Sequence, residues 1–270
     1  MTNHSFLVTC AGGKYILRIP GEGTDRLIDR EGEAAVYQAI EGKGIGDEIV
    51  FFDPINGYKV ARFFENARCC DASDMDDIQK CMKKLRAFHD LGLVVERQFD
   101  IFGQIAFYES LWDGTPSVYS DYQKVKEQTF SLREYIEAHT ERKVLTHIDA
   151  VSDNFLFVMD EFGREEIRLI DWEYAGMQDP HVDIAMFCVY SFYDRQQVDE
   201  LIEAYFTEGC SREIRIKIYA YISVCGLLWS NWCEYKYKLG IAFGEYAVRQ
   251  YQYAREYYQI VQDELRDDDE

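Results

Sequence analysis

The spacing of apolar residues changes near residue 68, and this change limits the possible folds more than any other feature of the chain. Before it, short runs rich in β-branched and aromatic residues alternate with turn signals. After it, apolar residues recur mostly at intervals of three and four, the spacing of amphipathic helices. We therefore predict an α+β protein with two parts, an amino-terminal lobe over residues 1–68 and a larger, mainly helical lobe over residues 69–270.

The amino-terminal lobe should be a small antiparallel sheet with one helix. Gly12-Gly13 and Asn56-Gly57 stand between β-rich runs, where glycine supplies the positive φ that a tight turn requires. The predicted strands cover residues 5–9, 14–19, 49–52 and 58–64, and the predicted helix covers about 27–40.

The second lobe should be helical, with one β-rich interruption between residues 144 and 172. Ser73 is predicted to cap its first helix, and the capping box Ser131-x-x-Glu134 should open another. Two long helices are predicted over about 212–238 and 243–265. Within the interruption, we expect short strands at 144–145, 155–158 and 167–170, a turn at 160–163, and, at the end of the chain, a solvated charged tail at 266–270.

The charge of the chain disfavours two classes of partner. It has 29 Lys and Arg against 49 Asp and Glu, a formal charge of −20, so phosphate backbones and anionic membrane surfaces would repel it. We therefore expect no nucleic-acid partner, and the charge suits a cationic one. The amino terminus lacks the pattern of a signal peptide, and no apolar run approaches the ~20 residues that cross a bilayer. We expect a cytoplasmic protein without membrane insertion.

The residues that indicate chemistry lie in the β-rich interruption. His147-x-Asp149-x-x-x-x-Asn154 places a carboxylate and an amide on one short loop, and Asp171 follows after the next hairpin. Phosphoryl transfer needs such a set, because a carboxylate orients the attacking hydroxyl while an Asn and an Asp hold Mg²⁺. The order of loop, hairpin and Asp-ending strand is that of protein-kinase-like folds. We group His147, Asp149 and Asn154 as the catalytic loop residues, and we interpret His147 as a structural hydrogen-bonding residue of this loop rather than a proton shuttle.

The amino-terminal lobe should then bind the nucleotide. Arg18 stands on the second predicted strand, where a kinase places the basic residue that contacts the phosphates. Glu33 follows on the predicted helix, in the position of the carboxylate that holds this base. The two residues together predict a bilobal protein-kinase-like fold with the nucleotide beside the sheet.

These residues resemble those of the choline/ethanolamine kinases, most closely the bacterial choline kinases of the LicA type. The similarity covers essentially the whole chain. It is carried by residues 17–21, 23–24, 29–33, 147–156, 170–175 and 183–185, by Trp229-x-x-Trp232 and by Phe243-Gly-Glu-Tyr-Ala247. The resemblance implies ATP and Mg²⁺ as cofactors and a cationic amino alcohol such as choline as substrate.

The resemblance also assigns roles to the acidic residues. It implies that Asp149 is the catalytic base and contacts the acceptor, that Asn154 and Asp171 bind Mg²⁺, and that Glu173 lies beside the metal. Together with Arg18 and Glu33, Asp171 would form the nucleotide-binding set.

The resemblance gives a role to part of the aromatic content, which is 15% of the chain. Trp229 and Trp232 are three apart on a predicted helix, hence neighbours on one face, and alone they would be interpreted as core residues. In choline kinases, the residues matching Trp229, Trp232, Tyr246 and Tyr174 line an aromatic cage. Such a cage suits a quaternary ammonium group, which has no hydrogen to donate.

Two departures from the family bear on function. Seven positions after Asp183, eukaryotic choline kinases carry a Glu in the cage, whereas this chain has Tyr190, which could stack on a cation or mark another substrate. The family also has an extra strand and a Gly-Gly before the segment that begins this chain. Either the start codon of this sequence is misassigned or the loop over the phosphates is shortened, and the second alternative would weaken ATP binding.

Three functions therefore stay open at the level of sequence. The first is an ATP-dependent kinase for choline or an ethanolamine-like alcohol. The second is a kinase for an aminoglycoside or another amino alcohol, which should not need Trp229. The third is a catalytically weak binding protein on the same scaffold, which ATP with Mg²⁺ would not stabilise against heat.

Overall fold

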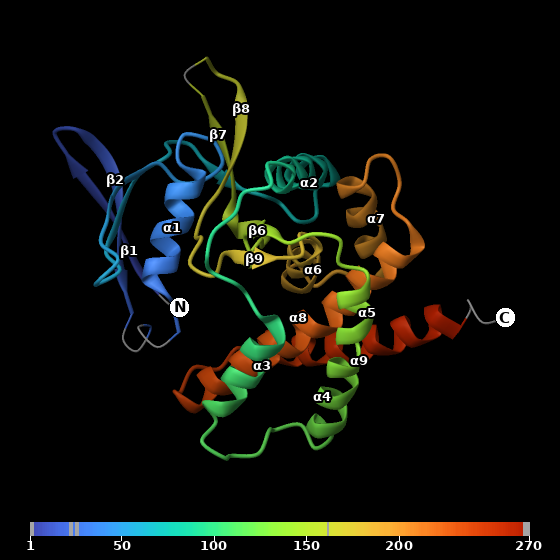
Figure 1. Ribbon diagram of the computed structural model, residues 1–270. Coiled ribbons are helices and arrows are strands. Elements are labelled where there is room, and N and C mark those ends of the chain that lie inside the picture. The colour runs from blue at the N-terminus through green and yellow to red at the C-terminus, as the bar shows by residue number, and fades with distance from the viewer. Residues whose placement is uncertain (1–2, 22–23, 25–26, 161, 267–270) are drawn as a thin grey trace. The chain divides into compact units, whose positions relative to one another are not determined.

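The structure of the protein is a computed structural model that describes residues 3–21, 24, 27–160 and 162–266 (Figure 1). The chain forms two compact units, each from two segments. The first contains Met1–Gln98 and Val144–Met177, and the second contains Phe99–Lys143 and Gln178–Glu270. The predicted lobe boundary at residue 68 stays a prediction.

An antiparallel four-stranded sheet forms the start of the first unit, as predicted. Its order is β1-β2-β4-β3, and helix α1 lies beside it (Figure 1). Asp29 caps α1 by accepting a hydrogen bond from the Gly32 amide, so the helix begins three residues later than predicted. The elements are β1 (Asn3–Cys10), β2 (Gly13–Pro20), α1 (Arg30–Ile40), β3 (Ile49–Phe52) and β4 (Lys59–Arg62).

The remainder of the first unit contains a helix and two small sheets. In one sheet, of order β5-β7-β8, strands β7 and β8 form the predicted hairpin, whose turn includes residue 161, outside the described residues. The other sheet pairs β6 with β9. The elements are β5 (Arg68–Cys69), α2 (Met75–Asp90), β6 (Val144–Thr146), the 3₁₀ turn Ser152–Asn154, β7 (Phe155–Met159), β8 (Glu165–Leu169) and β9 (Gly176–Gln178).

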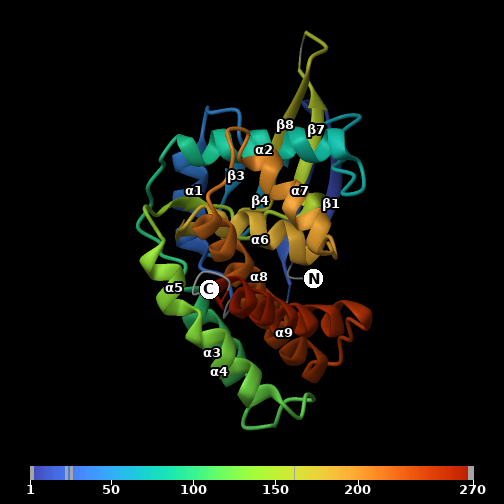
Figure 2. The ribbon, with the colours of Figure 1, turned by 90° about the vertical axis from the view of Figure 1, so that its right-hand side faces the viewer.

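The second unit is built around the long helix α8, which the sequence predicted with the observed bounds. Helix α9 packs along it, as Figures 1 and 2 both show, and α3 and α6 also contact it. Gly244, at a φ of 53°, precedes α9, which starts two residues later than predicted. The helices are α3 (Ile101–Ser110), α4 (Tyr122–Ser131), α5 (Arg133–Ala138), α6 (His181–Tyr190), α7 (Arg195–Tyr205), α8 (Arg212–Lys238) and α9 (Glu245–Arg266).

Two predicted helix caps are wrong. The cap of α2 is Asp74, because Ser73 is engaged with the Asp71 carboxylate through both its amide and its hydroxyl. Ser131 is the last residue of α4, and its hydroxyl donates to the Gln128 carbonyl oxygen. A serine in helical conformation bonds to the preceding turn, so it does not cap the following helix.

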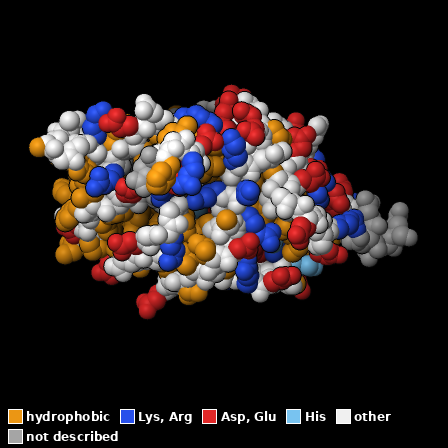
Figure 3. All heavy atoms as spheres, turned by 90° about the horizontal axis from the view of Figure 1, so that it is seen from above, with side chains coloured by type: hydrophobic (Ala, Val, Ile, Leu, Met, Phe, Trp, Pro, Cys, Tyr) orange, Lys and Arg blue, Asp and Glu red, His pale blue; other side chains and the backbone are white. Residues whose placement is uncertain are grey.

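The fold class is confirmed, since a small antiparallel sheet precedes a mainly helical part. Figure 3 shows acidic and basic side chains interspersed on one face, with hydrophobic side chains gathered over the β1–β4 sheet. The exposed apolar residues of this sheet include Phe6, Leu7, Val50 and Phe51. Within the described ranges, none of the helices is long and apolar enough to cross a membrane. The predicted charged tail falls mostly on residues 267–270, outside those ranges.

Candidate active site

A cavity of about 560 Å³ lies within the first unit. Apolar side chains from three strands line part of it, and charged groups line the rest. Its apolar lining includes Ile16, Ala61 and Leu156, and its charged lining includes Arg18, Lys59 and Asp171. This volume and mixed lining are typical of small-molecule and cofactor sites.

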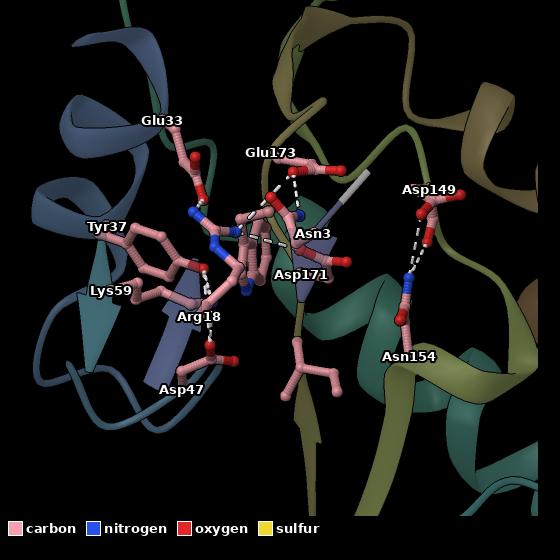
Figure 4. A network of polar contacts seen from close by, with 12 residues as sticks. Asn3, Arg18, Glu33, Tyr37, Asp47, Lys59, Asp149, Asn154, Asp171 and Glu173 are labelled. Carbon is pink, nitrogen blue, oxygen red and sulfur yellow. Dashed lines mark hydrogen bonds and ion pairs between the residues drawn. The ribbon is translucent and has the colours of Figure 1, made fainter. Parts of the chain in front are cut away.

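Arg18 joins the sheet to α1 and to the end of the β7–β8 hairpin (Figure 4). Its Nη2 lies 2.6 Å from Oε1 of Glu33, and its Nη1 donates to Oδ1 of Asp171 at 3.3 Å. Burial alone would lower the pKa of Arg18, but the surrounding negative charges, chiefly Glu33, raise it above its usual value. The structure thus brings the predicted pair Arg18 and Glu33 together, with Asp171 beside them.

Two further residues, Arg30 and Asn3, hold the acidic groups of this site, and neither contact was predicted from the sequence. Arg30 Nη1 donates to Oε2 of Glu33 at 2.9 Å and to Oε2 of Glu173 at 3.3 Å. Asn3 Nδ2 donates to the same Glu173 oxygen at 2.7 Å. The position of Arg30 three residues before Glu33 on one helix was a usable signal for this contact. Glu33 is therefore held between two guanidinium groups, and Glu173 is fixed in a buried position.

The surroundings of Asp171 would suit a bound cation. It follows the end of β8 in a left-handed backbone conformation, with φ 66°, a strain that proteins retain mainly at functional sites. Burial of the carboxyl group, and then the charge of Glu173, raise its pKa to about 7. Yet 37% of its side chain is accessible, so a cation can reach it. A bound cation would favour the charged form that these surroundings disfavour.

The predicted catalytic loop is closed by hydrogen bonds of its own. Asn154 Nδ2 donates to the backbone oxygen of Asp149 at 2.9 Å and to its Oδ2 at 3.2 Å (Figure 4). The carbonyl oxygen of the Asn154 side chain is then the atom suited to a cation. His147 is buried, and its Nε2 lies 2.9 Å from the backbone oxygen of Ile170, just before Asp171. This contact joins the loop to the segment that carries Asp171, and it is consistent with the structural role predicted for His147.

The residues of this site fit a magnesium ion. Asn154 and Asp171 line the same cavity, and each offers an oxygen ligand of the kind that Mg²⁺ prefers. Burial, and then the charge of Glu173, raise the pKa of Asp171, and a divalent cation would favour its charged form.

An aromatic cluster lies in the second unit, at the end of α6, in the second half of α8 and at the start of α9. Trp229 and Trp232 meet edge to face at 5.8 Å between ring centroids, and Phe243 lies 4.8 Å from Trp232. Tyr246 lies 6.3 Å from both Tyr190 and Phe243 and 5.8 Å from Phe192. We call these residues the aromatic cluster: Tyr190, Phe192, Trp229, Trp232, Phe243 and Tyr246.

The members of the aromatic cluster differ in their burial and in the groups that they contact. Trp229 is 8% exposed, and its Nε1 donates to the Met186 sulfur at 3.1 Å. The Lys236 ammonium group lies 5.4 Å from the Trp232 ring centroid, so this ring already attracts a cation. Phe192, at a φ of 59°, was not predicted from the sequence, because its spacing gives no signal.

Phe243 and Tyr174 differ from the other residues considered for the predicted cage. Phe243 belongs to one of the segments that carry the resemblance, but no role was predicted for it from the sequence. Tyr174 is buried in the first unit, and its predicted part in the cage stays a prediction.

An Arg–Glu pair beside an antiparallel sheet, an Asp–Asn loop and an Asp at the end of the next hairpin define a kinase-like phosphotransferase. A family model of choline/ethanolamine kinases matches residues 1–200, and the chain belongs to this family. It is an ATP-dependent kinase of small molecules, as the sequence predicted.

Known proteins resemble the chain over nearly its whole length. It is 28% identical over 262 residues to the protein LicA of Haemophilus influenzae, which covers 92% of this chain and 95% of that protein. The crystal structure of the choline kinase LicA from Streptococcus pneumoniae has a TM-score of 0.82 and 29% identity, covering 94% of this chain and 89% of that one.

A more distant structure supports the fold alone. An aminoglycoside phosphotransferase with 15% identity and a TM-score of 0.67 covers 95% of this chain and 90% of that one. The predicted protein-kinase-like fold is therefore confirmed.

Proposed function

We propose that this protein is a choline kinase, which transfers the γ-phosphoryl group of ATP to the hydroxyl oxygen of choline and releases ADP. One observation carries the choice of choline within the family. The rings of the aromatic cluster converge in the second unit, where Trp229, Trp232 and Tyr246 were predicted to form a cage. Aromatic faces attract a quaternary ammonium group without needing hydrogen bonds from it.

Asp149 is the proposed catalytic base. Its carboxylate would accept the hydroxyl proton while the bond from the choline oxygen to the γ-phosphorus forms and the bond to the leaving oxygen of ADP breaks. Asn154 supports this role, because its amide donates to the Asp149 carboxylate and fixes its direction. Such positioning supplies most of the catalysis in phosphoryl transfer, where the protein has little covalent work to do.

The nucleotide is assigned to the cavity of the first unit. Arg18 would bind the phosphates, and Glu33 and Arg30 fix its surroundings. Asn154 and Asp171 would hold Mg²⁺, which neutralises charge on the phosphates when bound. A structure of LicA that is 29% identical to this chain, with a TM-score of 0.81, contains AMP and so supports a nucleotide site on this fold.

Tyr190 offers a ring that can stack on the quaternary ammonium group of choline. It places a ring 6.3 Å from Tyr246 at the position where eukaryotic choline kinases carry a glutamate. A primary ammonium group such as that of ethanolamine gains more from hydrogen-bond acceptors than from rings. We therefore expect ethanolamine to be the poorer substrate.

A panel of acceptors tests the proposal. The purified protein is incubated with ATP, Mg²⁺ and either choline, ethanolamine or an aminoglycoside, and the phosphorylated product is identified by mass. We expect phosphocholine to form with the highest kcat/KM. A preference for the aminoglycoside would overturn the choice of substrate. Failure of ATP with Mg²⁺ to raise the melting temperature would indicate a binding protein without kinase activity.

A further inference from the structure

Lys59 is a buried lysine in the nucleotide cavity whose role the kinase pattern leaves open. It lies on β4 directly opposite Arg18 of β2 in the antiparallel register, and both side chains line the same cavity. Its side chain is 6% exposed. A lysine is rarely buried to this extent unless its charge is paired. The partners of Lys59 therefore indicate what it does.

Lys59 forms a closed group with one tyrosine and one aspartate. Its ammonium group donates to Oδ2 of Asp47 at 2.7 Å and to the hydroxyl oxygen of Tyr37 at 2.6 Å (Figure 4). The Tyr37 hydroxyl in turn donates to Oδ2 of Asp47 at 3.5 Å. Burial, and then the charge of Asp47, raise the pKa of Tyr37 well above its usual value, so the hydroxyl keeps the proton that it donates. We call these three residues the Lys59 triangle.

The Lys59 triangle connects three separate parts of the first unit. Tyr37 belongs to α1, Lys59 to β4, and Asp47 to the loop before β3. This loop is fixed in turn to β8, because the Leu169 amide donates to the Ile45 carbonyl oxygen at 2.8 Å. Gly46 permits the close approach, since a Cβ there would lie 2.7 Å from an Ile40 side-chain carbon.

Two residues of α1, one helical turn apart, contact two neighbouring residues of the sheet. Glu33 and Tyr37 are four residues apart, so they lie on one face of the helix about one turn from each other. Their partners, Arg18 and Lys59, face each other across β2 and β4. The helix is therefore held to the sheet at two neighbouring points, and a shift at either one would move the other.

We propose that Lys59 is a positioning residue for the kinase reaction: through Tyr37 it fixes α1 so that Glu33 keeps the Arg18 guanidinium directed at the nucleotide phosphates. This inference rests on the proposed role of Arg18. It differs from a purely structural role of Lys59, which would contribute stability and leave nucleotide binding unchanged. The Lys59 triangle thereby sets the affinity for ATP and leaves recognition of the acceptor to other residues.

Kinetics of substituted proteins separate these two roles. Lys59→Met should raise the KM for ATP about tenfold, as expected for a residue that acts through a coupled neighbour, with little change in the KM for choline. Tyr37→Phe keeps the ring and removes the hydroxyl, so it should act in the same direction more weakly. Lys59→Arg restores a buried cation and should recover part of the ATP affinity.

Lys217 supplies a matched control. It is a buried lysine of the second unit, and its ammonium group lies 2.6 Å from Oδ2 of Asp179. Lys217→Met should lower the melting temperature without changing the KM for ATP. If Lys59→Met and Lys217→Met lower stability alike and both leave the KM for ATP unchanged, the positioning role is overturned. Tyr37→Phe keeps the proposal testable even if Lys59→Met does not fold.

A second readout does not depend on activity. Hydrogen exchange of the α1 amides should become faster in Tyr37→Phe than in the unsubstituted protein, because the helix loses its hydrogen bonds to Lys59 and Asp47. Unchanged exchange would contradict the proposal. If exchange rises but Arg18→Lys leaves nucleotide binding unaltered, the assigned role of Arg18 fails and the link between Lys59 and ATP affinity fails with it.

Discussion

The charged site of the first unit and the aromatic cluster of the second unit are held together in opposite ways. In the charged site, Arg18, Arg30 and their acidic partners are joined by ion pairs and hydrogen bonds of fixed direction. In the aromatic cluster, rings contact one another at centroid distances between 4.8 and 6.3 Å, with edge-to-face and tilted geometry. The first arrangement suits the phosphates and metal of a nucleotide, and the second suits an organic cation.

The difference implies that the two substrates can be disturbed separately. A change of charge in the first unit should alter nucleotide binding and catalysis, and a change of ring in the second unit should alter acceptor binding. A KM that rises for one substrate alone reports a loss of binding to that substrate. The substitutions below follow this logic, from the largest expected effect to the smallest.

Replacing the proposed base should have the largest effect. Asp149→Ala is expected to lower kcat by a factor of about 100 to 10,000, the usual contribution of a positioned general base. The melting temperature should stay close to that of the unsubstituted protein, which shows that the fold is intact. Robust turnover in the variant would refute the assigned role.

Arg18→Lys should affect the nucleotide selectively. Lysine keeps the charge but lacks the planar fork of arginine, so the KM for ATP is expected to rise about tenfold. The KM for choline should be unchanged. An increase in the KM for choline alone would contradict the assignment of Arg18 to nucleotide binding.

A ring substitution should have a smaller effect, confined to the acceptor. Tyr246→Ala removes a ring that contacts Tyr190, Phe192 and Phe243, and should raise the KM for choline about threefold, the value of one partly exposed cation–π contact. Tyr246→Phe retains the ring and serves as the control. If both variants match the unsubstituted protein, Tyr246 does not contact the acceptor.

The pH dependence of stability should show the raised pKa of the buried Asp171 carboxyl group. Because the pKa of Asp171 rises from 3.8 to about 7 on folding, the folded protein retains a proton that the unfolded chain releases. The free energy of unfolding of the metal-free protein should therefore fall as pH rises between these values. Melting temperatures measured with a chelator should show a weaker decrease for Asp171→Asn. An equal decrease in both proteins would contradict the shift.

The sequence predicted the residues whose spacing reflects a chemical requirement. The order of Asp149, Asn154 and Asp171 identified one loop and one strand end, and the pair of Arg18 and Glu33 lies at 2.6 Å as expected. Secondary structure was predictable where periodicity was strong, as in the full extent of α8.

The residues that the sequence analysis missed depend on tertiary packing. Lys59, Tyr37 and Asp47 come from a strand, a helix and a loop, and no fixed spacing links them. Phe192 joins the aromatic cluster through a left-handed backbone, which its residue type does not favour. The capping box predicted at Ser131 does not form, because Ser131 is the last residue of helix α4 and not the cap of the next helix.

The most direct test of the account is the KM for choline in Trp229→Leu compared with Trp112→Leu. Trp112 is an equally large buried residue of the second unit, outside the aromatic cluster, whose Nε1 donates to the Asn231 carbonyl oxygen. The account predicts that Trp229→Leu raises the KM for choline about tenfold or more, with an unchanged KM for ATP, while Trp112→Leu changes neither. Equal KM values for choline in the two variants would contradict recognition of choline by the aromatic cluster.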